Sequence, residues 1–336
     1  MQQMLETAGE RVLFDIGVGW LTDLVSGSAS GLLEAPDEGS ATVVILVERD
    51  RRPFPSASWE ALGRGVRRQG SDVVVEDVGR SGLDLLVRSR AVPPRFIFRW
   101  RPSNETRVLR ASPARFRLRL RAALMQYPVL WRAATVARAP LHAACFQVAR
   151  ATALVVGTPG AGKSTALAAE AAGGGDVVSD NLCVADPRTV WGVVEPFRVE
   201  RGSSGALAGT RVGRTTHGRI ETVPARRLVA VEPDLIVMLR RGAENSVRDT
   251  NDGPAARLLV TSTYASGELR RFWPFAATLS MASGLGPAIP SVLQVARALT
   301  HRLPCIEVTL AEPGVRISDV LTEGDAAMAA SVGVAG

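Results

Sequence analysis

The sequence of 336 residues is almost without lysine. Its 40 lysine and arginine residues include one lysine, Lys163, so the other 39 are arginine. Cysteine is also scarce, and aromatic residues make up 5% of the chain. Arginine offers a planar fork and lysine a compact charge on a flexible stem, so a chain that uses lysine once indicates that this position needs that stem.

Neither a cysteine-bound metal site nor a disulfide framework is expected from the three cysteines, which are Cys145, Cys183 and Cys305. No pair has a metal-ligand spacing such as CxxC, and an odd count argues against a disulfide framework. We expect them to be small core residues.

Long apolar runs are missing as well. No stretch of 18 uncharged apolar residues occurs, and the N-terminus lacks the basic-then-apolar order of a signal peptide. These absences favour a cytoplasmic protein without a membrane partner. The net charge of +7 is compatible with an anionic partner. In the densest arginine cluster, however, the arginines alternate with apolar residues rather than with stacking aromatics. We therefore predict a solvated face and do not expect nucleic-acid binding. That cluster is Arg107, Arg110, Arg115, Arg117, Arg119 and Arg121.

Hydrophobic patterning predicts an α/β fold with an N-terminal α+β domain at 1–137, a larger domain at 138–322 and a flexible tail at 323–336. Apolar runs at 12–20, 41–48, 71–78, 83–88 and 95–100 predict strands, residues 56–70 predict one helix, and 113–137 has helical spacing. We expect the N-terminal domain to recognise a substrate or to support the larger domain.

In the larger domain, runs at 141–148 and 152–157 predict a β-hairpin, followed by a helix from 164 to 172 and a strand at 176–181. An apolar run at 226–242, interrupted by Pro233, precedes a helix at 290–303 and a closing strand at 304–310.

The strongest motif is the run GTPGAGKST between that hairpin and that helix. It matches GxxxxGK[ST] and predicts a phosphate-binding loop. Backbone N–H groups of such a loop converge on phosphate oxygens, Lys163 reaches the terminal phosphates, and the Ser164 hydroxyl can bind Mg²⁺. The expected nucleotide-binding residues are Gly157, Thr158, Pro159, Gly160, Ala161, Gly162, Lys163, Ser164 and Thr165. Thr165 is the one we expect to serve the helix more than the ligand.

A carboxylate follows the next predicted strand. Asp180 comes at the carboxyl end of this strand, where ligands gather in open α/β sheets, and could accept a proton from a hydroxyl or bind Mg²⁺. Asn181 could support the metal but cannot act as a base. His142, on the first strand of the hairpin, either packs in the core or reaches the site, and its spacing does not decide between the two.

These residues together resemble a known family. The run Leu141-His142-Ala143, the loop GTPGAGKST and the strand end Ser179-Asp180-Asn181 are similar to the catalytic domain of HPr kinase/phosphorylase, and more so to its kinase-like relatives beside peptide natural-product genes. The similarity covers about 50 residues closely and weakly extends to Val308. It implies a core like that of phosphoenolpyruvate carboxykinase, Asp180 as the base, His142 nearby, and Mg²⁺ held by Ser164 with an acidic pair.

The chain departs from this pattern at Asn181, where the family usually has a second aspartate. Glu195 or Asp186 could supply that carboxylate. The family's glycine-rich signature has only an approximate counterpart at 201–205, so the resemblance does not by itself imply phosphorylase activity.

Three arginines could clamp an anion, namely Arg198, Arg270 and Arg271, whereas we assign His217 and His301 to structure. Phe272 and Trp273 predict a core anchor beside Arg271.

The resulting expectation is an ATP- and Mg²⁺-dependent kinase. It would transfer the γ-phosphoryl group to a hydroxyl of a peptide, protein or small molecule, with Asp180, Lys163 and His142 as catalytic residues and Ser164, Asp180 and Asn181 at the metal. ATP is the default nucleotide because no NKxD-type guanine reader is visible. The alternatives are a nucleotide-binding regulatory protein and an NTP hydrolase, and a homo-oligomer is compatible with either.

Overall fold

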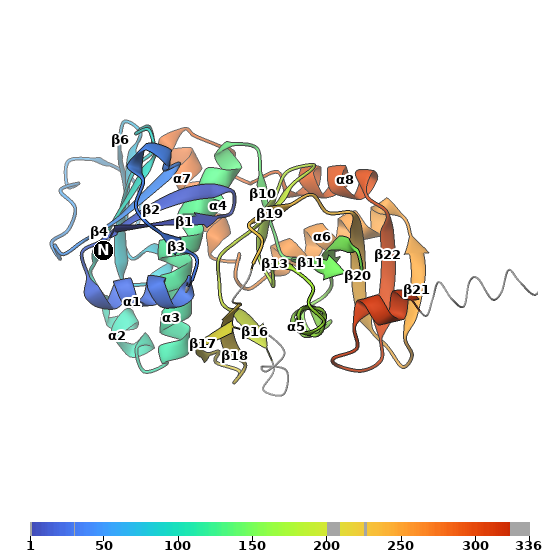
Figure 1. Cartoon of the computed structure of the whole chain (residues 1–336). Helices are drawn as coiled ribbons and strands as arrows, with labels where there is room; N and C mark the ends of the chain where they lie inside the picture. The colour runs from blue at the N-terminus through green and yellow to red at the C-terminus, as the bar shows by residue number, and fades with distance from the viewer. Residues whose placement is uncertain (1, 30, 200–208, 225–226, 323–336) are drawn as a thin grey trace, which may run out of the picture.

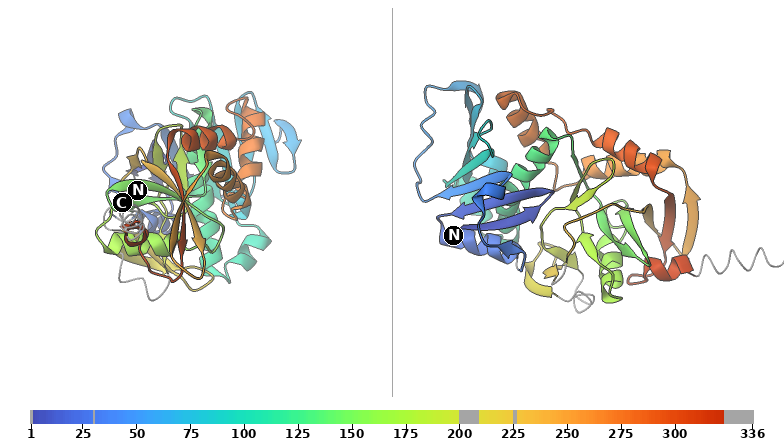
Figure 2. Two further views of the ribbon diagram at one scale, coloured as in Figure 1. Left: turned by 90° about the vertical axis from the view of Figure 1, so that its right-hand side faces the viewer. Right: turned by 45° about the horizontal axis from the view of Figure 1, so that its top comes forward.

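The computed structural model describes residues 2–29, 31–199, 209–224 and 227–322 (Figure 1). The chain has a mixed α/β fold, which agrees with the predicted class at this level. Two large sheets lie along the length of the molecule with two small sheets between them, as Figure 1 and the right-hand view of Figure 2 show. The predicted tail at 323–336 and the segment 201–205 lie outside the described residues.

The first sheet has nine strands and belongs to the N-terminal part of the chain. In spatial order they are β3 (Leu33–Glu34), β1 (Gln2–Thr7), β2 (Glu10–Ile16), β4 (Val43–Glu48), β9 (Arg95–Trp100), β8 (Leu83–Arg88), β7 (Asp72–Val75), β6 (Val66–Gln69) and β5 (Glu60–Gly63). β4 pairs in parallel with β2 and with β9, and the other neighbours are antiparallel. The parallel step from β2 to β4 requires a crossover, which α1 (Gly19–Ser28) provides.

The helix predicted at 56–70 is wrong. This segment forms the antiparallel hairpin of β5 and β6, with Gly65 at φ +72° in the turn. Glycine adopts this left-handed conformation without a steric penalty, whereas the three glycines of the segment, Gly63, Gly65 and Gly70, weaken a helix. Pairing of β6 with β7 supplies the backbone hydrogen bonds that a helix would otherwise have made.

The helical prediction for 113–137 is confirmed, with one irregularity. α3 (Pro113–Arg121) continues through a π-helical turn, η3 (Ala122–Gln126), into α4 (Tyr127–Thr135). Pro128 lies just after the π-helical turn and has no backbone N–H to donate, which accounts for the break in regular α-helical bonding. The short α2 (Asn104–Leu109) precedes α3, and the 3-10 turns η1 (Glu38–Ser40) and η2 (Val78–Arg80) lie in loops.

The arginine cluster is not one solvated face. Arg121 is buried and forms an ion pair with Glu221, with 3.2 Å between Nη1 and Oε1. Glu221, the partner of this helix residue, lies in a small sheet that packs near α3. The two residues are 100 positions apart in the sequence, so no local sequence pattern could predict their contact.

The second large sheet has six strands. In spatial order they are β13 (Val177–Ser179), β11 (Ala144–Val148), β12 (Ala151–Val156), β20 (Leu235–Arg241), β22 (Cys305–Leu310) and β21 (Ser246–Thr250). β11 and β12 form the predicted hairpin, and β12, β20 and β22 run parallel. The predicted helices correspond to α5 (Lys163–Ala172) and α8 (Val292–Arg302).

Alternate residues of β12 enter two different cores. Ala153 and Val155 pack with residues of α5, whereas Leu154 and Val156 pack with residues of α6 (Asp252–Ala265) and α8. Side chains of a strand alternate between its faces, so this sheet is covered by helices on both sides. The three cysteines are unpaired and buried, as predicted.

Two small sheets connect the large ones. One contains β10 (Ala139–Leu141), β14 (Cys183–Ala185), β15 (Val190–Gly192) and β19 (Ala230–Val231), and the other contains β16 (Phe197–Val199), β18 (Ile220–Pro224) and β17 (Gly209–Arg214). The backbone N–H of Ala8 donates to Gly192 O at 2.9 Å, which joins the first of them to the N-terminal sheet.

The core of the N-terminal sheet is completed from much later in the chain. Leu269, Phe272, Phe275 and Leu279 belong to or precede α7 (Phe272–Ser283) and lie in the same buried cluster as Phe14. The hydrophobic core of the N-terminal sheet therefore contains residues from both sides of the predicted boundary near residue 137. None of the helices in the described ranges is both long and apolar enough to cross a bilayer.

Replacement of a buried side chain of α7 by alanine is expected to destabilise the fold. Phe272 is fully buried and its ring centre lies 5.9 Å from that of Tyr127, so Phe272→Ala should lower the free energy of unfolding by about 3–5 kcal/mol. Met281, on the same helix, is 73% exposed, and Met281→Ala should change it by less than about 0.5 kcal/mol. Urea titrations of both variants test this, and similar losses in the two would contradict the packing.

Candidate functional site

The glycine-rich loop joins β12 to α5, in the strand, loop and helix order that the motif predicts. Gly160 and Gly162 have φ angles of +88° and +97°, where a side chain would be strained. A Cβ at Gly157 would lie 2.8 Å from Leu239 O, so the backbone of the loop also packs closely against β20. α5 begins at Lys163 without a side-chain cap, which leaves its first N–H groups to an anion.

Lys163 is buried at the start of α5. Its Nζ donates to Gly157 O at 2.9 Å and lies 3.4 Å from Nε2 of His142. Burial lowers the pKa of Lys163, and the charges of Asp180 and Glu268 act against this shift. The lysine therefore reaches across the loop toward the residues that follow the neighbouring strands.

His142 reaches the site. It lies in the link between β10 and β11 rather than on the strand where we expected it, and its backbone N–H donates to Thr263 Oγ1 at 3.0 Å. Burial, and next the charge of Lys163, lower the pKa of His142 to about 4, so the ring is neutral at pH 7. Nε2 of this ring faces Lys163, whereas Nδ1 has no hydrogen-bond partner within the described residues and lies 4.0 Å from Oε2 of Glu268.

Asp180 follows β13 directly, as predicted, and is almost completely buried. Its Oδ2 accepts the backbone N–H of Arg198 at 3.0 Å, whereas Oδ1 has no hydrogen-bond partner within the described residues. Burial raises the pKa of Asp180, although the Ser164 side chain and the Arg198 N–H favour the ionised form. A buried carboxylate oxygen without a partner is costly and marks a place for a ligand or a proton.

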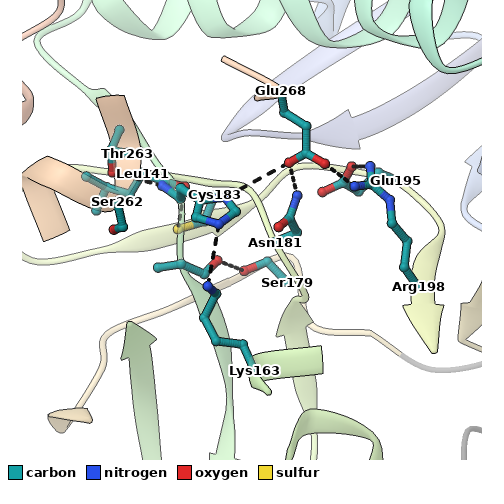
Figure 3. Close-up of polar contacts among 12 residues, drawn as sticks. Leu141, Lys163, Ser179, Asn181, Cys183, Glu195, Arg198, Ser262, Thr263 and Glu268 are labelled. Atoms are coloured by element: carbon teal, nitrogen blue, oxygen red, sulfur yellow. Dashed lines mark hydrogen bonds and ion pairs between the residues drawn. The ribbon is translucent and has the colours of Figure 1, made fainter. Parts of the chain in front are cut away.

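Glu268 is the site residue that the sequence did not reveal. It lies between α6 and α7. Its carboxylate accepts a hydrogen bond from Asn181 Nδ2 and forms an ion pair with Arg198 (Figure 3). Burial opposes its ionisation, but the charge and hydrogen bond of Arg198 outweigh this effect and lower the pKa of Glu268. In the sequence Glu268 stands two positions before Arg270 and belongs to no motif, so local spacing gives no signal for its role.

Glu195 and Asp186 were the two carboxylates that we considered as substitutes for the one absent at Asn181. Glu195 is buried and bonds to Arg198 Nη2 and to Gln126 Nε2, each at 3.3 Å. Burial raises its pKa to about 7. Asp186 instead accepts two backbone N–H groups in its own turn, from Arg188 and Thr189, each at 2.7 Å. Glu195 is therefore part of the buried cluster, and Asp186 serves a turn.

Arg198 connects this buried cluster. Its guanidinium contacts Glu195 and Glu268, and its backbone N–H contacts Asp180. Although its burial favours the neutral form, the neighbouring carboxylates outweigh this effect and raise its pKa above the ordinary value. Arg198 was considered as an anion clamp, but in this arrangement its charge is already used by carboxylates of the protein.

Two cavities adjoin the loop, and Pro159 lines both. The first, of about 730 Å³, is bounded by Thr158, Gly160 and Ala161 and by residues of β20 and α6. The second, of about 370 Å³, includes His142, Arg198 and Glu268 in its wall, together with Arg271 and His217. His217, which we assigned to structure, is thus a cavity residue. Thr165 lies in the first turn of α5, Arg270 is exposed, and His301 lies on α8.

A metal ion here would depend on a nucleotide for part of its coordination. No group of three or more His, Cys, Asp or Glu residues suited to a metal occurs among the described residues. Mg²⁺ commonly takes one or two protein oxygens and completes its shell with phosphates and water. Asp180 Oδ1 and the Ser164 hydroxyl fit that requirement, whereas Asn181 is occupied with Glu268.

Comparisons with known proteins add no further assignment. Neither the models of protein families nor the curated proteins gave a match to this chain.

Substitutions of Asn181 and Glu268 are expected to have coupled effects on stability, because the two side chains are hydrogen-bonded to each other. Asn181→Asp places two carboxylates in contact and should lower the free energy of unfolding by about 1–3 kcal/mol. Glu268→Gln alone should also lose stability, because it removes a carboxylate from the buried Arg198. In the double variant the new amide can donate to the new carboxylate, so its loss should be at least about 1 kcal/mol smaller than the sum of the two single losses. A double-mutant cycle by urea unfolding measures the coupling, and additive effects would contradict the contact.

The depressed pKa of His142 predicts a specific loss of stability in acid. The unfolded chain binds this proton below pH 6.5 and the folded chain only near pH 4, so unfolding becomes easier as the pH falls between them. Between pH 7 and pH 5 the wild type should lose about 2 kcal/mol more than His142→Gln. Equal losses in the two proteins, measured by urea unfolding at both pH values, would show that the folded ring titrates normally.

Proposed function

We propose that this chain is an ATP-dependent kinase that transfers the γ-phosphoryl group to a hydroxyl. The observation that carries the proposal is Asp180 Oδ1, a buried carboxylate oxygen without a partner in the described structure, next to a phosphate-loop lysine and serine. The two cavities that adjoin the loop offer one space for a nucleotide and one for an acceptor. Mixed α/β architecture is compatible with this activity but does not by itself imply it.

The larger cavity has the composition that a nucleotide requires. Arg240, Arg241 and Arg257 line it together with the apolar side chains of Met238 and Leu258. Arginine can pair with phosphates or stack on a base, and apolar side chains favour the faces of the base. The volume is within the range of ligand pockets of this kind.

The chemistry follows from the positions of three side chains. An acceptor hydroxyl oxygen forms a bond to the γ-phosphorus while the bond from that phosphorus to the β-γ bridging oxygen breaks, and ADP leaves. Asp180 Oδ1 takes the hydroxyl proton, a role that its raised pKa favours. Lys163 balances the charge of the phosphates, and neutral His142 orients Lys163 through Nε2. With Asp180 Oδ1 acting as the base, Mg²⁺ would be held by the Ser164 hydroxyl and by phosphate oxygens, and it would offset charge on the phosphates.

The resemblance to the catalytic domain of HPr kinase/phosphorylase supports the same proposal through Leu141, His142 and Asp180. It extends the expectation to a core like that of phosphoenolpyruvate carboxykinase. The alternative is a nucleotide-binding regulatory protein without efficient transfer, which Asn181 favours, because the amide at this position is bonded to Glu268 and offers no second acidic ligand.

Substitution of the proposed base should separate transfer from binding. Asp180→Asn is expected to reduce phosphoryl transfer by about 10²–10⁴-fold while ATP affinity changes less than about threefold, because the general base acts only in the chemical step. Lys163→Ala should weaken both. Asp186→Asn is the matched control, since Asp186 serves a remote turn.

The measurement is transfer of label from [γ-³²P]ATP with Mg²⁺ to peptides and to small molecules of a cell extract. Label on an organic acceptor that is lost in Asp180→Asn and kept in Asp186→Asn supports a kinase. Release of labelled phosphate to water alone would instead identify an NTP hydrolase. Tight ATP binding with neither product would identify a regulatory protein.

A further inference from the structure

The smaller cavity is built by parts of the chain that are distant in sequence. Its wall contains Arg119 of α3, Tyr127 of α4, His217 in the turn between β17 and β18, and Arg271 just before α7. The cavity reaches the buried cluster through His142 and Glu268 and reaches the glycine loop through Pro159. An acceptor in this cavity would therefore lie next to the glycine loop and to Arg198, whose backbone N–H donates to the proposed base Asp180.

The carboxylates in the wall are already neutralised. Glu221 pairs with the buried Arg121, and Glu268 pairs with Arg198. They leave no net negative charge to balance the other cationic side chains of the cavity. The electrostatic balance of the cavity therefore depends on its remaining arginines, which are Arg119, Arg219 and Arg271.

Arg119 and Arg271 face this cavity without a carboxylate of their own. The Arg271 side chain makes no ion pair or hydrogen bond within the described ranges, and the one hydrogen bond found there for the Arg119 side chain goes to Arg80 O at 3.4 Å. Burial, and next the charge of Arg271, lower the pKa of Arg119, which indicates that the two guanidinium groups act on each other. Two like charges at one cavity are stabilised by an anion between them.

Tyr127 provides a neutral donor at the same place. Burial raises its pKa to about 12, against the opposing charges of Arg271 and Arg119, so its phenol stays protonated at neutral pH. A phenol can donate a hydrogen bond to the same anion. Ala114, Leu118 and Ala122 add apolar surface.

We infer that the acceptor is anionic and that Arg119 and Arg271 bind its carboxylate or phosphate group. This inference rests on the proposed kinase function, because only a kinase would use the bound anion as a phosphoryl acceptor. Binding of the anion itself does not require phosphoryl transfer. The bound anion would fix the acceptor at one end, and its hydroxyl would then point toward Asp180. Arg119 and Arg271 are thereby specificity-determining residues rather than catalytic ones.

The tyrosine content of the chain offers a direct reporter of binding. The sequence has two tyrosines, Tyr127 and Tyr264, and only Tyr127 lines this cavity. Labelling with ¹³Cζ-tyrosine gives two NMR signals, with Tyr264 as the internal reference. Titrations in the presence of saturating ADP keep the probes away from the glycine loop.

Probes are matched pairs that differ in charge. D-glycerate and glycerol 3-phosphate are compared with glycerol, and a short serine peptide containing aspartate is compared with its asparagine counterpart. The carboxylate, phosphate and peptide arms distinguish the sources of the anion. We expect a saturable shift of the Tyr127 signal with at least one charged member, at least about tenfold tighter than with its neutral partner.

Variants identify the residues responsible. Arg119→Gln and Arg271→Gln should each weaken that binding by at least about tenfold, since each removes charge-assisted hydrogen bonds. Arg119→Lys should retain part of the preference for charge. Arg270→Gln is the matched control because Arg270 is exposed, neighbours Arg271 and lies outside the cavity wall.

Several outcomes would overturn the inference: equal shifts with charged and neutral probes, no saturable shift with any probe, or equal weakening in Arg270→Gln and Arg271→Gln. Failure of the kinase proposal looks different. In that case the anions still bind and shift the Tyr127 signal, but no label passes from ATP to any acceptor.

Discussion

The buried charge of Arg198 is the interaction on which the site depends. Its guanidinium lies between Glu195 and Glu268, and its backbone N–H holds Asp180. Removing one member of a buried ion pair leaves an uncompensated charge, which costs several kcal/mol, so these side chains fix one another's positions. Arg198 lies on β16, and its pairing partner β18 carries Glu221, so the same small sheet also reaches the buried Arg121 of α3.

This arrangement makes the site a joint product of the whole chain. The six-stranded sheet contributes the loop, Lys163 and Asp180. The long helical segment contributes Gln126, which bonds to Glu195. Glu268 comes from the turn that precedes α7, the helix whose apolar side completes the core of the N-terminal sheet. Movement between the two large sheets would therefore be coupled to the buried carboxylates.

The distribution of charge suggests a division of labour among the arginines. Arg121 and Arg198 are buried and serve carboxylates of the protein itself. Arg240, Arg241 and Arg257 line the cavity that we propose for the nucleotide, and Arg119 and Arg271 line the one that we propose for the acceptor. Lys163 remains the single lysine because its flexible stem bends back to Gly157 O and His142, a path that a rigid fork does not follow easily.

The sequence by itself determined the local features: the glycine loop with its strand and helix, the β11–β12 hairpin, the helical segment after Pro113, and Asp180 at a strand end. Each depends on residues close together in the chain, where periodicity and turn chemistry act. The local sequence did not predict the hairpin at 60–69, because this hairpin is stabilised by pairing with β7. Only the tertiary structure decided that Glu268 lies beside Asn181, that Arg121 is buried and that His217 lines a cavity, because these contacts join distant segments through charge and packing.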